Sequence, residues 1–198
     1  MSSRTVSLSQ SETMTATIID GRAVSETLRS KMRSRVESLG LRGVRPGLAV
    51  ILVGEDAASQ IYVRNKAKAC EDVGMYSEVL RYPGDVAEDV ILAKIAELNE
   101  DVRIHGILVQ LPLPAQIDNK KVLEAIAPGK DVDGFHRQNV GALVIGVSDF
   151  PPCTPFGVMA LLDHYRIPIE GSNAVVIGRV AGGGQRPSIP TRWMSRAW

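Results

Sequence analysis

The chain has 198 residues, of which 44% are hydrophobic and 23% charged, and its formal net charge is +1. This length corresponds to one or two domains, and the composition is ordinary for a globular protein with a hydrophobic core. The near-zero charge gives no indication of a nucleic-acid or membrane partner, and no apolar run approaches the roughly 18–20 residues that span a membrane.

Cysteine and histidine are sparse and unpatterned. Cys70 and Cys153 lie far apart and form no CxxC pair, and the three histidines have no metal-ligand spacing. Two isolated cysteines are typical of a reducing compartment, so we expect a cytoplasmic protein without a metal site.

The N-terminal segment changes character at Met14. Residues 1–13 are polar and rich in serine and threonine, without the apolar centre of a secretory signal. We expect a disordered leader with Met14 as the natural start. A short strand is predicted at Ala16–Asp20, and a helix over 23–39, where apolar residues recur every three or four positions. The predicted buried face of this helix consists of Val24, Leu28, Met32, Val36 and Leu39.

A buried strand and the helix after it form the centre of the predicted fold. Leu48–Val53 is apolar throughout, as a strand covered on both faces should be. After Gly54 the pattern becomes helical to about Val73. Tyr62 and Lys66 are four residues apart, so they share one face of this helix, where a phenol and an amine can bind and protonate a small polar substrate. The alternative is a half-exposed helix with a solvated lysine.

The rest of the chain continues to alternate between strand and helix. The sequence predicts strands at Tyr76–Tyr82, Ile104–Gln110 and Ala174–Ile177, and helices over 86–99 (buried face Val90, Ile91, Ile95 and Leu98), Asn119–Ile126 and Phe156–Tyr165. This alternation predicts an α/β fold with a mainly parallel sheet. Ligands of such sheets bind beyond the carboxyl ends of the strands, where Gly54, Gln110 and Gly178 lie.

The last nineteen residues do not fit this pattern. After Arg179 both tryptophans of the chain appear, acidic residues are absent, and Pro187 and Pro190 prevent a helix. The Gly182-Gly183-Gly184 run lacks GxGxxG spacing and a following helix, so it does not indicate a phosphate loop. We expect residues 180–198 to be an aberrant tail produced by truncation or a frameshift.

Five segments occur in one order: SQIYVRNKAKA, GILVQLPLP, PGKDVDGFH, PPCTPFGVMALL and NAVVIGR. Over about residues 14–179 the chain resembles the bifunctional methylenetetrahydrofolate dehydrogenase/cyclohydrolase (FolD) family. The resemblance implies NADP-dependent oxidation of 5,10-methylenetetrahydrofolate and hydrolysis of the 5,10-methenyl product to 10-formyltetrahydrofolate. It also implies a folate-binding αβα domain, a Rossmann-like NADP domain, a cleft between them and a homodimer.

The resemblance assigns roles to individual residues. Lys66 resembles the catalytic lysine, Tyr62 its partner that orients the substrate, and Gln110 the amide that hydrogen-bonds the lysine. Asp133 resembles the carboxylate that binds the pterin ring, whose adjacent N–H groups it can accept in bidentate fashion. Residues Gln110, Leu111, Pro112 and Tyr62 are expected to contact the folate. The alternatives are an edge tyrosine, a glutamine that caps its own loop, and an aspartate that stabilises the turn before Gly134.

For the cofactor, Gly178 and Arg179 resemble the start of the NADP site, where arginine suits the 2′-phosphate. We therefore expect a leader at 1–13, a folate-binding catalytic domain at 14–150, the beginning of a Rossmann-like domain at 151–179 and the aberrant tail at 180–198. Most of the cofactor domain is then missing, and an inactive or folate-binding-only fragment is the first alternative. The second is an unrelated nucleotide-binding or flavodoxin-like module.

Overall fold

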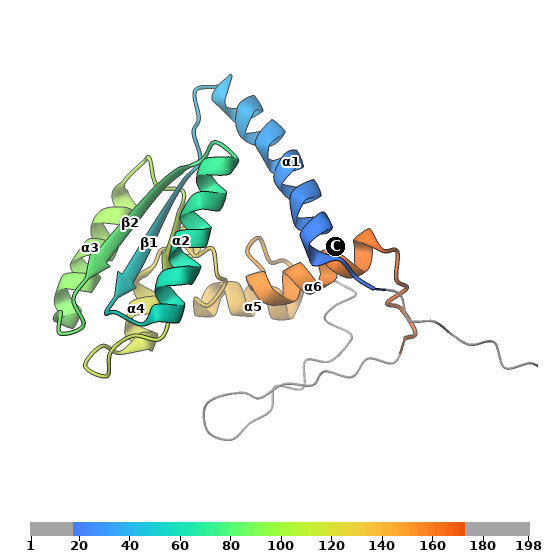
Figure 1. Ribbon diagram of the computed structural model, residues 1–198. Coiled ribbons are helices and arrows are strands. Elements are labelled where there is room, and N and C mark those ends of the chain that lie inside the picture. The colour runs from blue at the N-terminus through green and yellow to red at the C-terminus, as the bar shows by residue number, and fades with distance from the viewer. Residues whose placement is uncertain (1–17, 173–198) are drawn as a thin grey trace, which may run out of the picture.

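The computed structural model describes residues 18–172. In this range helices and strands alternate from α1 to α4, and only helical elements follow (Figure 1). The elements are α1 (Gly21–Gly40), β1 (Gly47–Val53), α2 (Ala57–Asp72), β2 (Tyr76–Tyr82), α3 (Glu88–Glu100), β3 (Gly106–Val109), α4 (Asn119–Ala125), the 3₁₀ turn η1 (Pro128–Lys130), α5 (Arg137–Ile145) and α6 (Cys153–His164).

The described strands form one parallel sheet in the order β2-β1-β3. Gly47 to Val53 of β1 pair with Tyr76 to Tyr82 of β2, and Leu48 to Ile51 pair with Gly106 to Val109 of β3. The central strand is β1, which explains its apolar sequence: neither of its faces meets water. The predicted α/β fold with a parallel sheet is confirmed.

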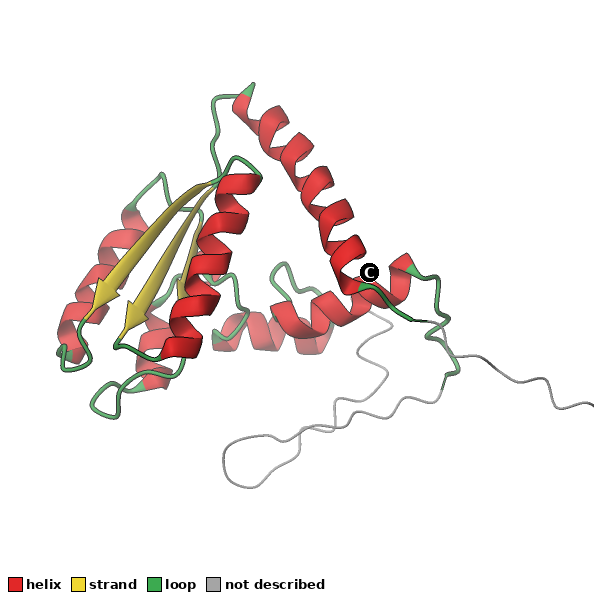
Figure 2. Cartoon of the chain, viewed as in Figure 1, coloured by secondary structure: helices red, strands yellow, loops and turns green. Residues whose placement is uncertain are grey.

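Helices cover both faces of the sheet (Figure 2). Alternate residues of β1 point to opposite faces. Ala49, Ile51 and Val53 pack with α3 and α4, while Val50 and Leu52 pack against Val63 of α2. The result is the predicted αβα layering, and it fixes which side of α2 faces the sheet.

Several details differ from the sequence predictions. Residues 18–20 form no strand, because Asp20 is the N-cap of α1: its Oδ1 accepts hydrogen bonds from the backbone N–H groups of Arg22 and Ala23 at 2.9 and 3.2 Å. Val90, predicted as buried, is 46% exposed, because the face of α3 turned toward the sheet carries Ile91, Ile95 and Leu98, which are buried as predicted. Helix α5 was not predicted.

Helix α1 slants away from the layered core: its C-terminal end leads back to β1, and its N-terminal end meets α6 (Figure 1). The backbone N–H of Asp20 donates a hydrogen bond of 2.9 Å to the hydroxyl of Tyr165, just beyond α6. Leu28 and Met32, predicted as core, are 37% and 44% exposed because the sheet does not reach them. The predicted strand Ala174–Ile177 lies outside the described residues, as do the leader and the tail.

Candidate active site

Helix α2 holds Tyr62 and Lys66 beside the sheet. The helix begins where Gly54, with φ of +83°, turns the chain out of β1, and Asp56 caps it by accepting a 2.8 Å hydrogen bond from the backbone N–H of Ser59. Val63 is fully buried and fixes the rotation of the helix. Lys66, one turn later on the same side, is half-buried, whereas Tyr62 is 63% exposed.

The segment carrying Asp133 lies against the same face. Val132 packs on the cluster formed by Val50, Leu52, Val63 and Leu108. This packing depends on Gly106 of β3, since a Cβ there would lie 2.4 Å from Cγ1 of Val132. Asp131 forms a parallel bridge with Ile107, so the chain runs in the direction of β3. Asp133 is thereby carried toward the carboxyl end of β3.

Lys66 and Asp133 lie close enough for their charges to interact, because Val132 packs on the cluster that includes Val63 of α2. Burial raises the pKa of the Asp133 carboxyl, the positive charge of Lys66 lowers it, and the negative charge of Asp131 raises it again. Lys66 also acts on Cys153 at the start of α6. Burial, and then the charge of Asp133, raise the pKa of the Cys153 thiol, whose sulfur donates a 3.3 Å hydrogen bond to the carbonyl of Val132. A protonated thiol in this position packs and donates, and it is a poor nucleophile.

Gln110 lies where β3 ends, with its backbone N–H bonded to the carbonyl of Ile51 at 2.9 Å. Its side-chain Nε2 donates a 2.8 Å hydrogen bond to the carbonyl of Leu111, which is the loop-capping contact weighed as an alternative. Within residues 18–172 no hydrogen bond joins Gln110 to Lys66. The Leu111–Pro112 peptide is cis, and Pro112 is exposed at this edge of the sheet.

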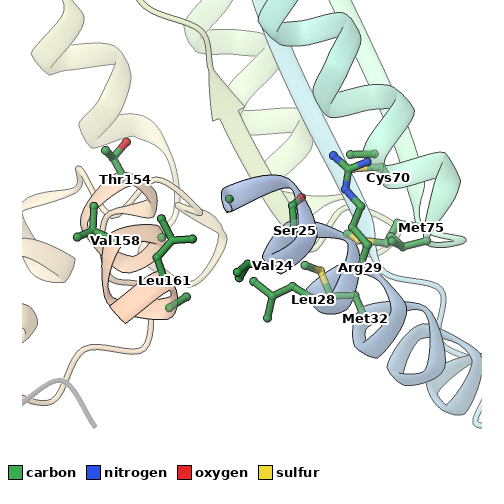
Figure 3. A pocket seen from close by; sticks show the side chains of 15 residues that line it. Val24, Ser25, Leu28, Arg29, Met32, Cys70, Met75, Thr154, Val158 and Leu161 are labelled. Carbon is green, nitrogen blue, oxygen red and sulfur yellow. The ribbon is translucent and has the colours of Figure 1, made fainter. Parts of the chain in front are cut away.

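One cavity lies elsewhere, between α1, the end of α2 and α6 (Figure 3). Its volume is about 490 Å³, and Val24, Leu28 and Met32 of α1 face Val158 and Leu161 of α6 across it. The lining is almost wholly apolar and includes none of the predicted site residues. Its polar side chains are Ser25, Arg29 and Thr154, and none of them is a carboxylate that could accept the N–H groups of a pterin, so we do not assign the folate to it.

Asp131 was overlooked by the sequence reasoning. Its carboxylate is 2% exposed, and the sequence alone does not distinguish it from Asp133, which flanks Val132 on the other side. Gly178 and Arg179, the predicted cofactor residues, lie outside the described part of the chain. Among the residues that are described, no group of three or more His, Cys, Asp or Glu side chains could hold a metal ion, and no helix is long and apolar enough to cross a membrane.

The pairing of Lys66 with Asp133 gives a measurable expectation. Replacing Lys66 with glutamine removes a positive charge that lowers the pKa of Asp133, so that pKa will rise. Carboxyl-carbon NMR titration of the aspartates measures it directly, with Lys68→Gln, an exposed lysine of the same helix, as the matched control. An unchanged Asp133 titration in Lys66→Gln would mean that the two groups do not interact.

Because the folded-state pKa of Asp133 is raised, its contribution to stability is present at low pH and is lost as pH rises through that pKa.

Comparison with known proteins places these residues in a family. The family model described as tetrahydrofolate dehydrogenase/cyclohydrolase, catalytic domain, matches residues 19–133. The bifunctional protein FolD of Burkholderia thailandensis is 62% identical over 166 residues, which cover 84% of this chain and 58% of the relative. The chain therefore spans just over half the length of that relative.

Solved structures give the same result. The bifunctional FolD methylenetetrahydrofolate dehydrogenase/cyclohydrolase from Campylobacter jejuni is 47% identical with a TM-score of 0.80, covering 83% of this chain and 58% of that one. The dehydrogenase-cyclohydrolase from Trypanosoma brucei, solved with NADP cofactor and inhibitor, is 38% identical with a TM-score of 0.76, covering 79% of this chain and 54% of its own. With the family model matching residues 19–133 and a relative 62% identical over 84% of the chain, the chain belongs to the tetrahydrofolate dehydrogenase/cyclohydrolase family.

Proposed function

We propose that this chain supplies the folate-binding and catalytic part of an enzyme of one-carbon folate metabolism. The reactions are the NADP-dependent oxidation of 5,10-methylenetetrahydrofolate and the hydrolysis of the 5,10-methenyl product to 10-formyltetrahydrofolate. The observation that supports this most is that Val132, next to Asp133, packs on the sheet face covered by α2, so that the charge of Lys66 acts on Asp133 although the two residues are far apart in sequence. Tyr62 lies one helical turn from Lys66.

Lys66 suits the hydrolytic step. Water adds its oxygen to the methenyl carbon and loses a proton. The bond from that carbon to the ring nitrogen then breaks as the nitrogen takes up a proton, and the remaining hydroxyl proton leaves to solvent as the formyl C=O forms. An amine within reach of both atoms can accept the first proton and return the second. In the same proposal Tyr62 orients the substrate. The Oε1 oxygen of Gln110 accepts a hydrogen bond from the lysine, since its Nε2 is used by Leu111.

Asp133 is proposed to hold the pterin. In its ionised form the carboxylate accepts two parallel hydrogen bonds from the ring N–H and the exocyclic amine. Leu111 and Pro112, at the end of β3, are proposed as a wall of the same site. Because burial raises the pKa of Asp133, the carboxylate form, and with it folate affinity, is lost as pH falls through a pKa higher than that of a solvated aspartate.

The proposed cofactor is NADP, held by Gly178 and Arg179. The described residues do not themselves offer a dinucleotide site. The N-terminus of α2 follows a parallel strand, but the carboxylate of Asp56 occupies it and would repel a phosphate. The assignment of NADP therefore depends on the resemblance of the Gly178-Arg179 segment to the family's cofactor site.

We propose that the protein acts in the cytoplasm and that the intact enzyme is a homodimer. We propose no nucleic-acid or membrane partner. Both cysteines of the described chain are free, which agrees with a reducing compartment. The homodimer is taken from the family resemblance alone.

A titration separates folate binding from the other candidates. The 198-residue chain is expected to bind 5-formyltetrahydrofolate and not AMP. Asp133→Ala should weaken this affinity by roughly 10- to 100-fold, because hydrogen bonds to a charged group contribute about 1.5–3 kcal/mol. Asp85→Ala, at an exposed turn, is the control. Binding of AMP without binding of the folate would refute the proposal, and an assay for NADPH formation distinguishes the bifunctional enzyme from a fragment that only binds folate.

A further inference from the structure

Asp131 is a buried carboxylate for which the proposed chemistry has no use. It is 2% exposed, and burying a charge is costly unless hydrogen bonds compensate for it. Two hydrogen bonds to one oxygen compensate for the buried charge. Its Oδ2 accepts one hydrogen bond from the backbone N–H of His136 at 2.8 Å and another from Nδ2 of Asn139 at 2.9 Å.

Both donors belong to the start of α5. His136 is the N-cap of this helix, and Asn139 lies in its first turn. Nδ2 of Asn139 also donates to the carbonyl of Pro128 at 3.0 Å, so one side chain joins the segments before and after the Asp133 loop. At the N-terminal end of the Asp133 loop, the backbone of Asp131 forms a parallel β-bridge with Ile107 of β3.

Only residues 132–135 lie between these two anchors. The loop that they form is closed by a hydrogen bond of 3.4 Å from the N–H of Gly134 to the carbonyl of Asp131. With one end fixed on β3 and the other on α5, the loop has little freedom to move Asp133 away from Lys66.

We propose that Asp131 and Asn139 are positioning residues that fix this loop, so that the carboxylate of Asp133 meets the folate already ordered. That Asp133 binds folate depends on the function proposed above, whereas the ordering of the loop does not. The gain is entropic: a preordered carboxylate does not lose conformational freedom when the ligand binds.

The first test measures loop order without ligand, by amide hydrogen exchange on the 198-residue chain. Asn139→Ala and Asp131→Ala should speed exchange at Gly134 and His136. Asp131→Asn should not, because both hydrogen bonds end on one oxygen, which the amide group can supply. The matched control is Asn99→Ala. Asn99 is a half-buried asparagine with two hydrogen bonds, both to the backbone: it donates to the carbonyl of Ala125 and accepts from the N–H of Ala127.

The second test measures affinity for 5-formyltetrahydrofolate. Asn139→Ala should weaken binding by about fivefold, the equivalent of one hydrogen bond, while Asn99→Ala stays within about twofold of the wild type. Asp131→Asn should retain affinity at neutral pH. Because the charge of Asp131 raises the pKa of Asp133, Asp131→Asn should also move the acid midpoint of binding to lower pH. Asn139→Ala leaves that charge in place and should not move it.

The outcomes are distinguishable. Unchanged exchange at residues 133–136 in Asn139→Ala, or an equal increase in Asn99→Ala, overturns the ordering of the loop by these two residues. Faster exchange with unaltered affinity overturns their role in binding. A wild-type chain that does not bind the folate removes the proposed function and the affinity argument with it, and the exchange result alone then decides whether Asp131 and Asn139 order the loop.

Discussion

Lys66→Ala will abolish hydrolysis of 5,10-methenyltetrahydrofolate when it is introduced into this sequence joined to the C-terminal half of a full-length relative. We expect turnover to fall by about 10²–10⁴-fold, the usual contribution of a positioned proton-transfer group. The loss should appear in kcat, since the amine acts on the proton transfers that accompany bond making and breaking. Loss of methenyl absorbance measures the rate.

Lys68→Ala is the matched control for this experiment. It removes the same charge from the same helix, two residues away, at an exposed position. Its turnover should stay within about twofold of the parent. Full activity in Lys66→Ala would refute the catalytic assignment, and equal losses in both variants would point to damage to α2 instead.

Gly134→Ala will destabilise the fold and weaken folate binding together. Gly134 has φ of +68°, and a Cβ there would lie 2.5 Å from the carbonyl oxygen of Phe150 and 3.2 Å from the nitrogen of Pro152. Both neighbours are backbone atoms, so the segment before α6 must shift. The left-handed conformation costs about 1–2 kcal/mol for alanine, and the overlap adds roughly 1–3 kcal/mol. Urea unfolding and the 5-formyltetrahydrofolate titration measure the two effects.

The variant Gly146→Ala measures the cost of the left-handed backbone conformation without the steric overlap of an added Cβ. Gly146 also has a positive φ, +80°, but nothing lies within 4 Å of the added Cβ. This variant should lose only the conformational part of the free energy of unfolding and should bind folate normally. If the two alanine variants are equally stable, the close approach of the Gly134 and Phe150 segments does not constrain the fold.

The central layer was predictable because its signals are local. The apolar run of β1, the glycine after it and the four-residue spacing of Tyr62 and Lys66 each determine structure within a few positions, and the elements appear as predicted. The failures arose where the outcome depends on distant neighbours. Ile18 and Ile19 have a strand-like composition, but no described strand pairs with them and Asp20 instead caps α1.

The candidate site was predictable only in part, for the same reason. Spacing places Tyr62 beside Lys66, but no local rule brings Asp133 to them, and that expectation came from family resemblance. Burial is also a tertiary property, so the sequence could not show that Asp131, rather than Asp133, is the carboxylate enclosed by hydrogen bonds. For Gln110 the structure shows the loop contact from its amide nitrogen to Leu111, while its contact with Lys66 stays a prediction.

The thiol contact between α6 and the Asp133 loop links two parts of the molecule mechanically. Cys153 is the first residue of α6, and its sulfur holds the carbonyl of Val132, next to the carboxylate proposed to bind folate. A change in the orientation of α6 therefore displaces the carbonyl of Val132 and, with it, the neighbouring carboxylate of Asp133. By thermodynamic reciprocity, a ligand that favours one orientation of the carboxylate also favours one angle of α6 and of whatever polypeptide follows it.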